Sequence, residues 1–192
     1  MKSEYFLITN AKARFVSVFA PNKHGKYSIQ LILDESDPQV AELQAKIDKL
    51  VKATFPGTVR GLKKPLHFGD TEQDLVRYPE YAHTVYFEPS STYQPQVIGP
   101  DGSPLTQSGG HPWSGDIVNA AVNLYSFDVP GNKGIGVGLG QVQFWKAGQT
   151  NARGLNTVVF PTADPKSLTT AAPEIVPSEE KTFEELLDEC PF

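Results

Sequence analysis

Apolar and polar residues alternate along several short stretches of the chain, and this alternation is typical of β-strands with one buried face. In residues 27–33, for example, Ile29 and Leu31 share one face while Gln30 lies on the other. The stretches that we expect to form strands are residues 5–9, 11–20, 27–33, 81–88, 116–127 and 134–148. The pattern therefore predicts a mainly β protein.

A different period, in which apolar residues recur every three to four positions, predicts one amphipathic helix after the third strand. Its apolar stripe consists of Val40, Leu43, Ile47, Leu50 and Val51. Asp37 is a suitable N-cap, and Pro38 suits the first helical position. Pro56 and Gly57 then end the pattern.

The last predicted strand has an unusual face made of glycine. Gly134, Gly136, Gly138 and Gly140 alternate with Ile135, Val137 and Leu139. A strand face without side chains permits strong curvature or the close approach of another chain. Beyond Gly140 the apolar positions change phase, to Val142 and Phe144, which predicts a β-bulge or corner.

Strongly bent strands, a single helix and long loops together predict a small barrel. Residues 89–115 are rich in Pro, Gly, Ser and Gln and form the longest expected loop. We expect an OB fold, a five-stranded β-barrel whose exposed strand face binds extended polymers, with the helix after the third strand. A β-sandwich also fits the strand pattern.

Charge divides the 192-residue chain into two parts. Its net charge is -5, but residues 171–192 contain one Lys and seven acidic residues, which leaves +1 for residues 1–170. We therefore expect an OB-fold domain over residues 1–165 and a disordered, acidic C-terminal tail over residues 166–192. With 39% hydrophobic and 20% charged residues, the whole composition suits one globular domain with an appendage.

The sequence also indicates a compartment. No apolar run approaches the roughly 18 residues that a membrane span requires, and the N-terminus lacks the apolar region of a signal peptide. Cys190 is the only cysteine and has no partner for an internal disulfide, which suits a reducing cytoplasm. We expect no membrane association.

Candidate catalytic groups are few. His67, Asp70, Glu72 and Asp74 form the best metal-like cluster, but Leu75 stands where a calcium loop needs glycine. His111, Ser114 and Asp116 are neighbours in sequence, which is not the geometry of a catalytic triad. We predict no catalytic residue, metal or cofactor, and a metal-dependent nuclease around residues 67–74 remains a minor alternative.

A nucleic-acid interface is better supported, because single-strand binders combine aromatic faces that stack on bases with a cationic path for the phosphates. The outward strand positions and one loop supply the stacking candidates Tyr86, Trp113, Tyr125, Phe127 and Trp145. Strand ends and loops supply the phosphate-binding candidates Lys12, Arg14, Lys23, Lys26, Lys63, Lys64, Arg77, Lys133 and Lys146.

The C-terminal tail has features of a binding peptide. An apolar stripe of Phe183, Leu186 and Leu187 runs through the acidic residues, and the chain ends in Cys-Pro-Phe. A terminal ring can fill an apolar pocket while carboxylates contact basic residues of a partner. The predicted partner-binding residues are Glu184, Glu185, Asp188, Glu189 and Phe192.

Residues 114–123 and 133–144 resemble paired strands of one phage family, and the acidic tail with its final Pro-Phe is similar to the tails of single-strand binders. The chain thus resembles phage single-stranded DNA-binding proteins of OB fold. This resemblance implies sequence-independent binding of single-stranded DNA in phage DNA replication, recombination and repair, without catalysis, in the cytoplasm of the infected bacterial host. The tail would recruit replication proteins such as polymerase or helicase-primase, and would compete with DNA for the groove.

Two further expectations remain open at this point. The resemblance makes a homodimer plausible. A protein-protein adaptor or inhibitor that uses a β-barrel sheet edge is the main alternative function.

Overall fold

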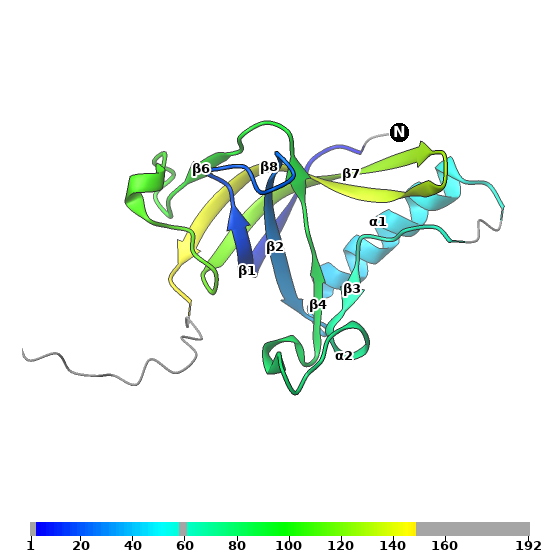
Figure 1. Ribbon diagram of the computed structural model, residues 1–192, viewed down its shortest axis with the longest axis horizontal. Helices are drawn as coiled ribbons and strands as arrows, with labels where there is room; N and C mark the ends of the chain where they lie inside the picture. The colour runs from blue at the N-terminus through cyan, green and yellow to red at the C-terminus, as the bar shows by residue number, and fades with distance from the viewer. Residues whose placement is uncertain (1–2, 58–60, 149–192) are drawn as a thin grey trace, which may run out of the picture. The chain divides into compact units, whose positions relative to one another are not determined.

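The computed structural model describes residues 3–57 and 61–148. Its elements, in chain order, are β1 (Phe6–Ser17), β2 (Tyr27–Asp34), α1 (Pro38–Thr54), β3 (His67–Phe68), α2 (Gly69–Glu72), η1 (Pro79–Tyr81), β4 (Thr84–Phe87), β5 (Ser90–Ser91), β6 (Gln96–Ile98), η2 (Gln107–Gly109), β7 (Ile117–Val129) and β8 (Asn132–Lys146) (Figure 1). The prediction of a mainly β protein is therefore confirmed.

The strands close into a barrel because β1 pairs with two neighbours. β1 is antiparallel to β2 on one side and to β7 on the other, and β7 is antiparallel to β8. β4 and β5 pair with successive parts of β2 and so occupy one position in the barrel. β5 then meets β8 in parallel, which completes the ring β1, β2, β4 with β5, β8 and β7. These five positions confirm the expected OB-fold barrel.

The helix follows the second strand, so the prediction that it follows the third was wrong. Residues 5–9 and 11–20 were expected to be separate strands, but β1 runs from Phe6 to Ser17 without a turn. At Asn10 the backbone adopts a positive φ of 54°, and the pairing with β7 shifts between Ile8 and Ala11. The break in alternation is a β-bulge inside one strand, since a bulge changes the facing of side chains without ending the strand.

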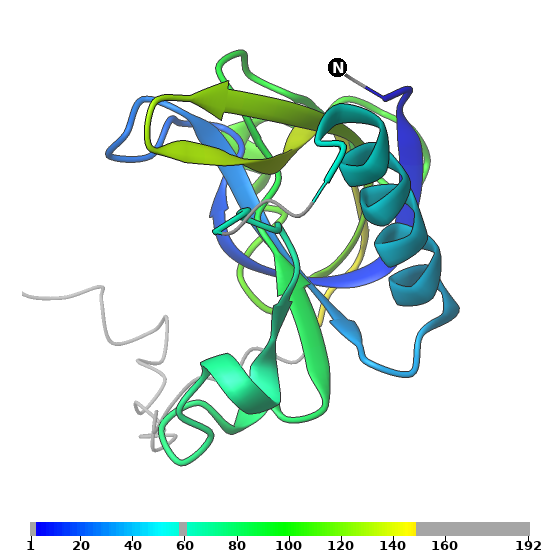
Figure 2. The same cartoon turned by 90° about the vertical axis from the view of Figure 1, so that its right-hand side faces the viewer.

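α1 lies along one side of the barrel, as Figure 2 shows. The Asp37 carboxylate accepts a hydrogen bond from the Gln39 N–H and caps the helix, as expected from the sequence. Val40, Leu43, Ile47 and Leu50 are buried in the same core cluster as the strands. Burying each such side chain stabilises the fold by about 1.5–3 kcal/mol. Within the described residues no helix is long and apolar enough to cross a membrane.

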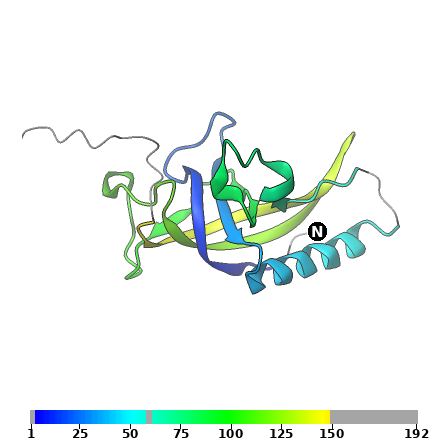
Figure 3. The ribbon, with the colours of Figure 1, turned by 90° about the horizontal axis from the view of Figure 1, so that it is seen from below.

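The β7–β8 hairpin is the longest pairing in the barrel, and Figure 3 shows its two strands running together past α1. Its inward side chains are Val118, Ala120, Val122 and Leu124 on β7 and Ile135, Val137, Leu139 and Val142 on β8. Leu139 and Val142 are three residues apart, yet both are buried, because the register shifts opposite Ala121. The predicted bulge after Gly140 is therefore confirmed.

Gly134 of β8 has no room for a side chain, because the backbone of Lys63 lies against it. Lys63 bridges to β8 at Gly134, and its carbonyl oxygen accepts the Ile135 N–H at 2.9 Å. A methyl group on Gly134 would lie within 3.0 Å of that carbonyl oxygen, which is backbone and has little freedom to move. We expect Gly134→Ala to lower the free energy of unfolding by about 1–3 kcal/mol, measured by urea denaturation.

Gly109→Ala is the matched control, because a methyl group there meets nothing within 4 Å. Equal stability of the two variants would show that the Lys63 bridge does not constrain β8.

Candidate nucleic-acid interface

The outer face of β8 is a row of glycines that side chains from other segments cover. In the hairpin register Phe127 lies opposite Gly134, Tyr125 opposite Gly136, and Asn123 opposite Gly138. A methyl group on any of these three glycines would come within 3.0 Å of the facing side chain, and one on Gly140 would come within 3.0 Å of the Tyr5 ring. Glycine therefore lets large side chains lie directly across the strand.

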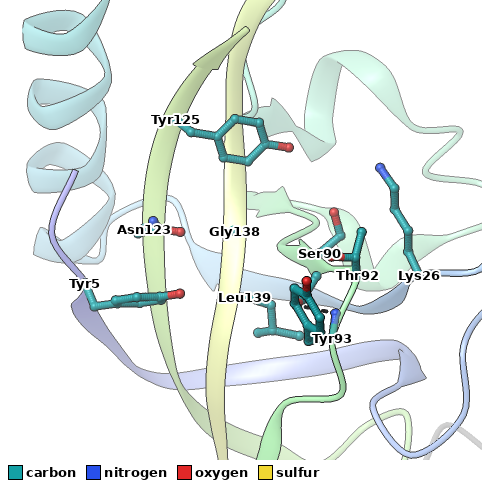
Figure 4. A pocket seen from close by; sticks show the side chains of 10 residues that line it. Tyr5, Lys26, Ser90, Thr92, Tyr93, Asn123, Tyr125, Gly138 and Leu139 are labelled. Atoms are coloured by element: carbon teal, nitrogen blue, oxygen red, sulfur yellow. Dashed lines mark hydrogen bonds between the residues drawn. The ribbon is translucent and has the colours of Figure 1, made fainter. Parts of the chain in front are cut away.

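Beside this row the surface is hollowed into a cavity of about 450 Å³, within the usual size range of ligand sites. Its lining comes from β7, β8, β5 and the segments next to β1 and β2 (Figure 4). We call it the tyrosine groove, and the residues that line it are Tyr5, Lys26, Ser90, Ser91, Thr92, Tyr93, Asn123, Tyr125, Gly138 and Leu139.

The tyrosine groove offers the two kinds of group that a nucleic-acid strand requires. Tyr5 and Tyr93 are 55% and 83% exposed, and Tyr125 is half-buried above Gly136, so three rings border the hollow. Lys26 is exposed at its edge, where an ammonium group can contact phosphate. The hydroxyl groups of Ser90 and Thr92 add hydrogen-bonding capacity.

Four predicted stacking residues lie in two places. Tyr125 and Phe127 are neighbours on the glycine row, with ring centroids 6.4 Å apart. Trp145 and Trp113 are both exposed. Trp145 lies at the other end of the hairpin, next to Lys146, which pairs with Ile117. Of these four residues, only Tyr125 lines the tyrosine groove.

Tyr86 was predicted to be an outward stacking residue, but the structure contradicts this. Its side chain is 8% exposed and packs against Tyr81, and its ring stacks on His67. The Gln73 side chain donates a hydrogen bond to its hydroxyl at 2.6 Å. Residues 69–83 therefore cover the outer face of β2 and β4, which alternation alone assigned to solvent.

Arg14 was expected to contact phosphate, but the same covering segment occupies it. Its guanidinium forms an ion pair with Glu80 and lies over the rings of Tyr78 and Tyr81. Both charged side chains are largely buried. Arg14 fastens the segment to β1 instead of facing an open groove.

The other predicted basic residues are spread over the described surface. Lys26 lines the tyrosine groove, and Lys23 lies in the same turn. Lys64 pairs with Asp48 at 3.8 Å and Lys133 with Asp128 at 3.0 Å, both in exposed positions where such pairs are weak. The remaining candidates are Lys12, half-buried on β1, Lys63, exposed beside Gly134, Arg77, over the Tyr78 ring, and Lys146, exposed at the end of β8.

The sequence did not single out Tyr5, Tyr93 or Asn123 as groove residues. Tyr5 was assigned to a strand and Tyr93 to the long loop, and their meeting depends on barrel closure. The position of Asn123 could have been predicted from the register of the hairpin. Counting outward from the turn at Gly131 pairs Asn123 with Gly138 and Tyr125 with Gly136, so the hairpin register alone places them over the glycines.

The acidic residues of the metal-like cluster have local partners. Glu72 contacts the His67 ring at 2.7 Å, Asp70 contacts His83 at 3.2 Å, and Asp74 accepts the Val76 N–H. Across residues 3–57 and 61–148, no group of three or more His, Cys, Asp or Glu side chains is placed to hold a metal ion.

The predicted partner-binding residues Glu184, Glu185, Asp188, Glu189 and Phe192 lie outside the described residues, as does the expected boundary at residue 165.

The barrel architecture is shared with solved structures of phage single-stranded DNA-binding proteins. The protein from bacteriophage Enc34 in complex with single-stranded DNA matches with a TM-score of 0.67 and 18% identity, over 77% of this chain and 89% of that chain. The T7 protein gp2.5, a single-stranded DNA-binding protein, matches with a TM-score of 0.55 and 12% identity, over 79% of this chain and 96% of that chain. At these identities the shared feature is the fold.

Sequence comparison gives the family. The model of the family described as "Enterobacter phage Enc34, ssDNA-binding protein" matches residues 6–157. Protein p50 of Acyrthosiphon pisum secondary endosymbiont phage 1 is 38% identical over 155 residues, which cover 73% of this chain and 83% of p50. The chain therefore belongs to the Enc34 single-stranded DNA-binding protein family, which confirms the resemblance found in the sequence.

Tyr81, in the segment of residues 69–83, makes the free energy of unfolding sensitive to pH in the alkaline range. Burial raises the pKa of the Tyr81 hydroxyl above its usual 10.0, and the nearby Arg14 charge opposes this. The folded state then holds the proton more tightly than the unfolded state, so this stabilisation is complete below pH 10.0 and is lost as the pH rises through the raised pKa. We expect the free energy of unfolding to fall more steeply above about pH 10 in the wild type than in Tyr81→Phe.

Urea denaturation at about pH 8 and about pH 11 measures this difference. Tyr93→Phe, which removes an exposed hydroxyl, is the control and should follow the wild type. The same pH dependence in wild type and Tyr81→Phe would contradict the role given to Tyr81.

Proposed function

We propose that the protein binds single-stranded DNA without sequence dependence and that the tyrosine groove is its binding surface. One observation carries the proposal: Tyr5, Tyr93 and Tyr125 border a hollow over the glycine row of β8, with Lys26 at its edge. Membership in the Enc34 family supports it. The protein acts by binding alone, without catalysis.

Two physical effects supply the affinity. Bases stack on the tyrosine rings, at about 1–3 kcal/mol per base, and every base has a face that can stack. Lys26, with Lys23 in the same turn, contacts phosphates and releases counterions, so binding weakens as salt rises. Duplex DNA keeps its bases stacked inside the helix and competes poorly.

In the infected bacterial host cytoplasm, the protein coats single strands during phage DNA replication, recombination and repair. The OB-fold domain is residues 1–165, and the acidic tail of residues 166–192 recruits replication proteins, such as polymerase or helicase-primase. Seven carboxylates in residues 171–192 and the final Phe192 support a basic partner surface with an apolar pocket. We also propose that two copies associate as a homodimer.

The tail also competes with DNA. It is a polyanion linked to the domain, so its local concentration at a cationic groove is high whenever DNA is absent. In this proposal the tail occupies the groove when DNA is absent. When DNA binds, the tail is released and can bind partner proteins.

The groove is tested with labelled oligo-dT and fluorescence anisotropy. We expect Tyr125→Ala to weaken binding by the loss of one stacking contact, about 1–3 kcal/mol or roughly 5- to 150-fold. We expect Lys26→Gln to reduce the slope of log affinity against log salt by about 0.7, the value for one phosphate contact on a single strand.

Phe68→Ala and Lys49→Gln are the matched controls, since both side chains are exposed outside the tyrosine groove. No binding of oligo-dT by the wild type would refute the proposed function and favour an adaptor. Equal losses in the groove variants and the controls would refute the groove as the site.

A chain truncated after residue 165 tests the tail. We expect it to bind oligo-dT more tightly than the full chain at low salt, and the difference should shrink as salt screens both interactions. Anisotropy titrations at two salt concentrations measure this. Unchanged or weaker binding by the truncated chain at low salt would contradict competition by the tail.

A further inference from the structure

Asn123 carries a polar atom whose hydrogen-bonding capacity is unused. The side chain is 1% exposed, and its amide nitrogen Nδ2 has no hydrogen-bond partner. Figure 4 shows Asn123 between Tyr125 and Tyr5, on the face of β7 that borders the tyrosine groove. Buried amide groups nearly always have a partner, because leaving one without a hydrogen bond is costly.

The amide oxygen of the same side chain is already confined. Oδ1 lies over the backbone of Gly138, so close that a methyl group on that glycine would be within 3.0 Å of it. The glycine thus makes room for the amide and directs its oxygen to β8. Nδ2, a donor, is the atom left for a ligand.

We infer that Asn123 contacts one base of the bound strand, by donating a hydrogen bond from Nδ2 to an acceptor atom of that base. This inference rests on the proposed function. The base stacks on Tyr125 and displaces the Tyr5 ring, which lies over the neighbouring Gly140 and is more than half exposed. A neighbouring group must move aside because Nδ2 has almost no accessible surface in the structure.

Every base can accept such a hydrogen bond. Thymine, cytosine and guanine each offer a carbonyl oxygen, and adenine offers ring nitrogens that also accept from an N–H. Asparagine normally recognises adenine with both amide atoms, the oxygen accepting from the amino group. Here Oδ1 faces Gly138, so that bidentate contact is not available. Nδ2 therefore acts as a single donor that adds affinity for a base without selecting among the four, in agreement with binding that does not depend on sequence.

The test compares oligo-dT with an oligonucleotide of equal length that lacks bases, each bound to the full-length protein at low salt. One neutral hydrogen bond corresponds to a preference for oligo-dT of about three- to tenfold. We expect Asn123→Leu, of similar size but without an amide, to lose that part of the ratio of the two affinities. Asn123→Ala is a second variant that cannot clash, and thermal unfolding checks that both are folded.

The contribution of base stacking on the tyrosine rings cancels when the ratio for a variant is divided by the ratio for the wild type. Asn119→Leu is the control, because Asn119 is also on β7 but its amide already donates to Gln143 at 2.9 Å. A ratio that falls in both Asn123 variants and not in the control supports the inference. An unchanged ratio, with oligo-dT still bound, overturns it and leaves the proposed function intact, whereas no binding by the wild type overturns both.

Discussion

The β7–β8 hairpin depends on one steric condition: alternate residues of β8 have no side chain. Their absence lets Tyr125 and Phe127 of the neighbouring strand lie across β8, while Val137 and Leu139 of the same strand fill the barrel core. A single strand thus supplies a packed interior face and a smooth exterior face. Barrel closure then brings Tyr93 and Lys26, which are distant in sequence, to the edge of that exterior face.

Local pattern was sufficient for much of the fold. The α1 stripe, its Asp37 cap and the bulge after Gly140 all follow from the spacing of neighbouring residues, so the sequence predicted them. The predicted position of the helix in the strand order was wrong, because the sequence pattern around Asn10 does not distinguish a bulge within one strand from a turn between two strands. The parallel contacts of β5 and β6 with β8 join segments roughly 50 residues apart, and no periodicity in a Pro- and Gly-rich loop indicates them.

The residues of the candidate site were likewise predicted correctly where the structure is local and wrongly where distant segments meet. Tyr125 and Phe127 lie on the outer face that alternation assigned to them, because a hairpin is a local structure. Tyr86 and Arg14 also belong to outward faces of their strands, but residues 69–83 fold over them and convert an exposed face into a small second core. Alternation describes one sheet and contains no information about a distant segment that packs on it.

The glycine row also constrains how this sequence can change over evolutionary time. Every amino acid other than glycine adds a Cβ, so a substitution at 136 or 138 is compatible with the facing residue only if that residue also becomes smaller or moves. Positions 125 and 136, and positions 123 and 138, are therefore coupled pairs. Related sequences that have lost one member of a pair should carry a compensating change at the other, and an alignment would show covariation across the hairpin.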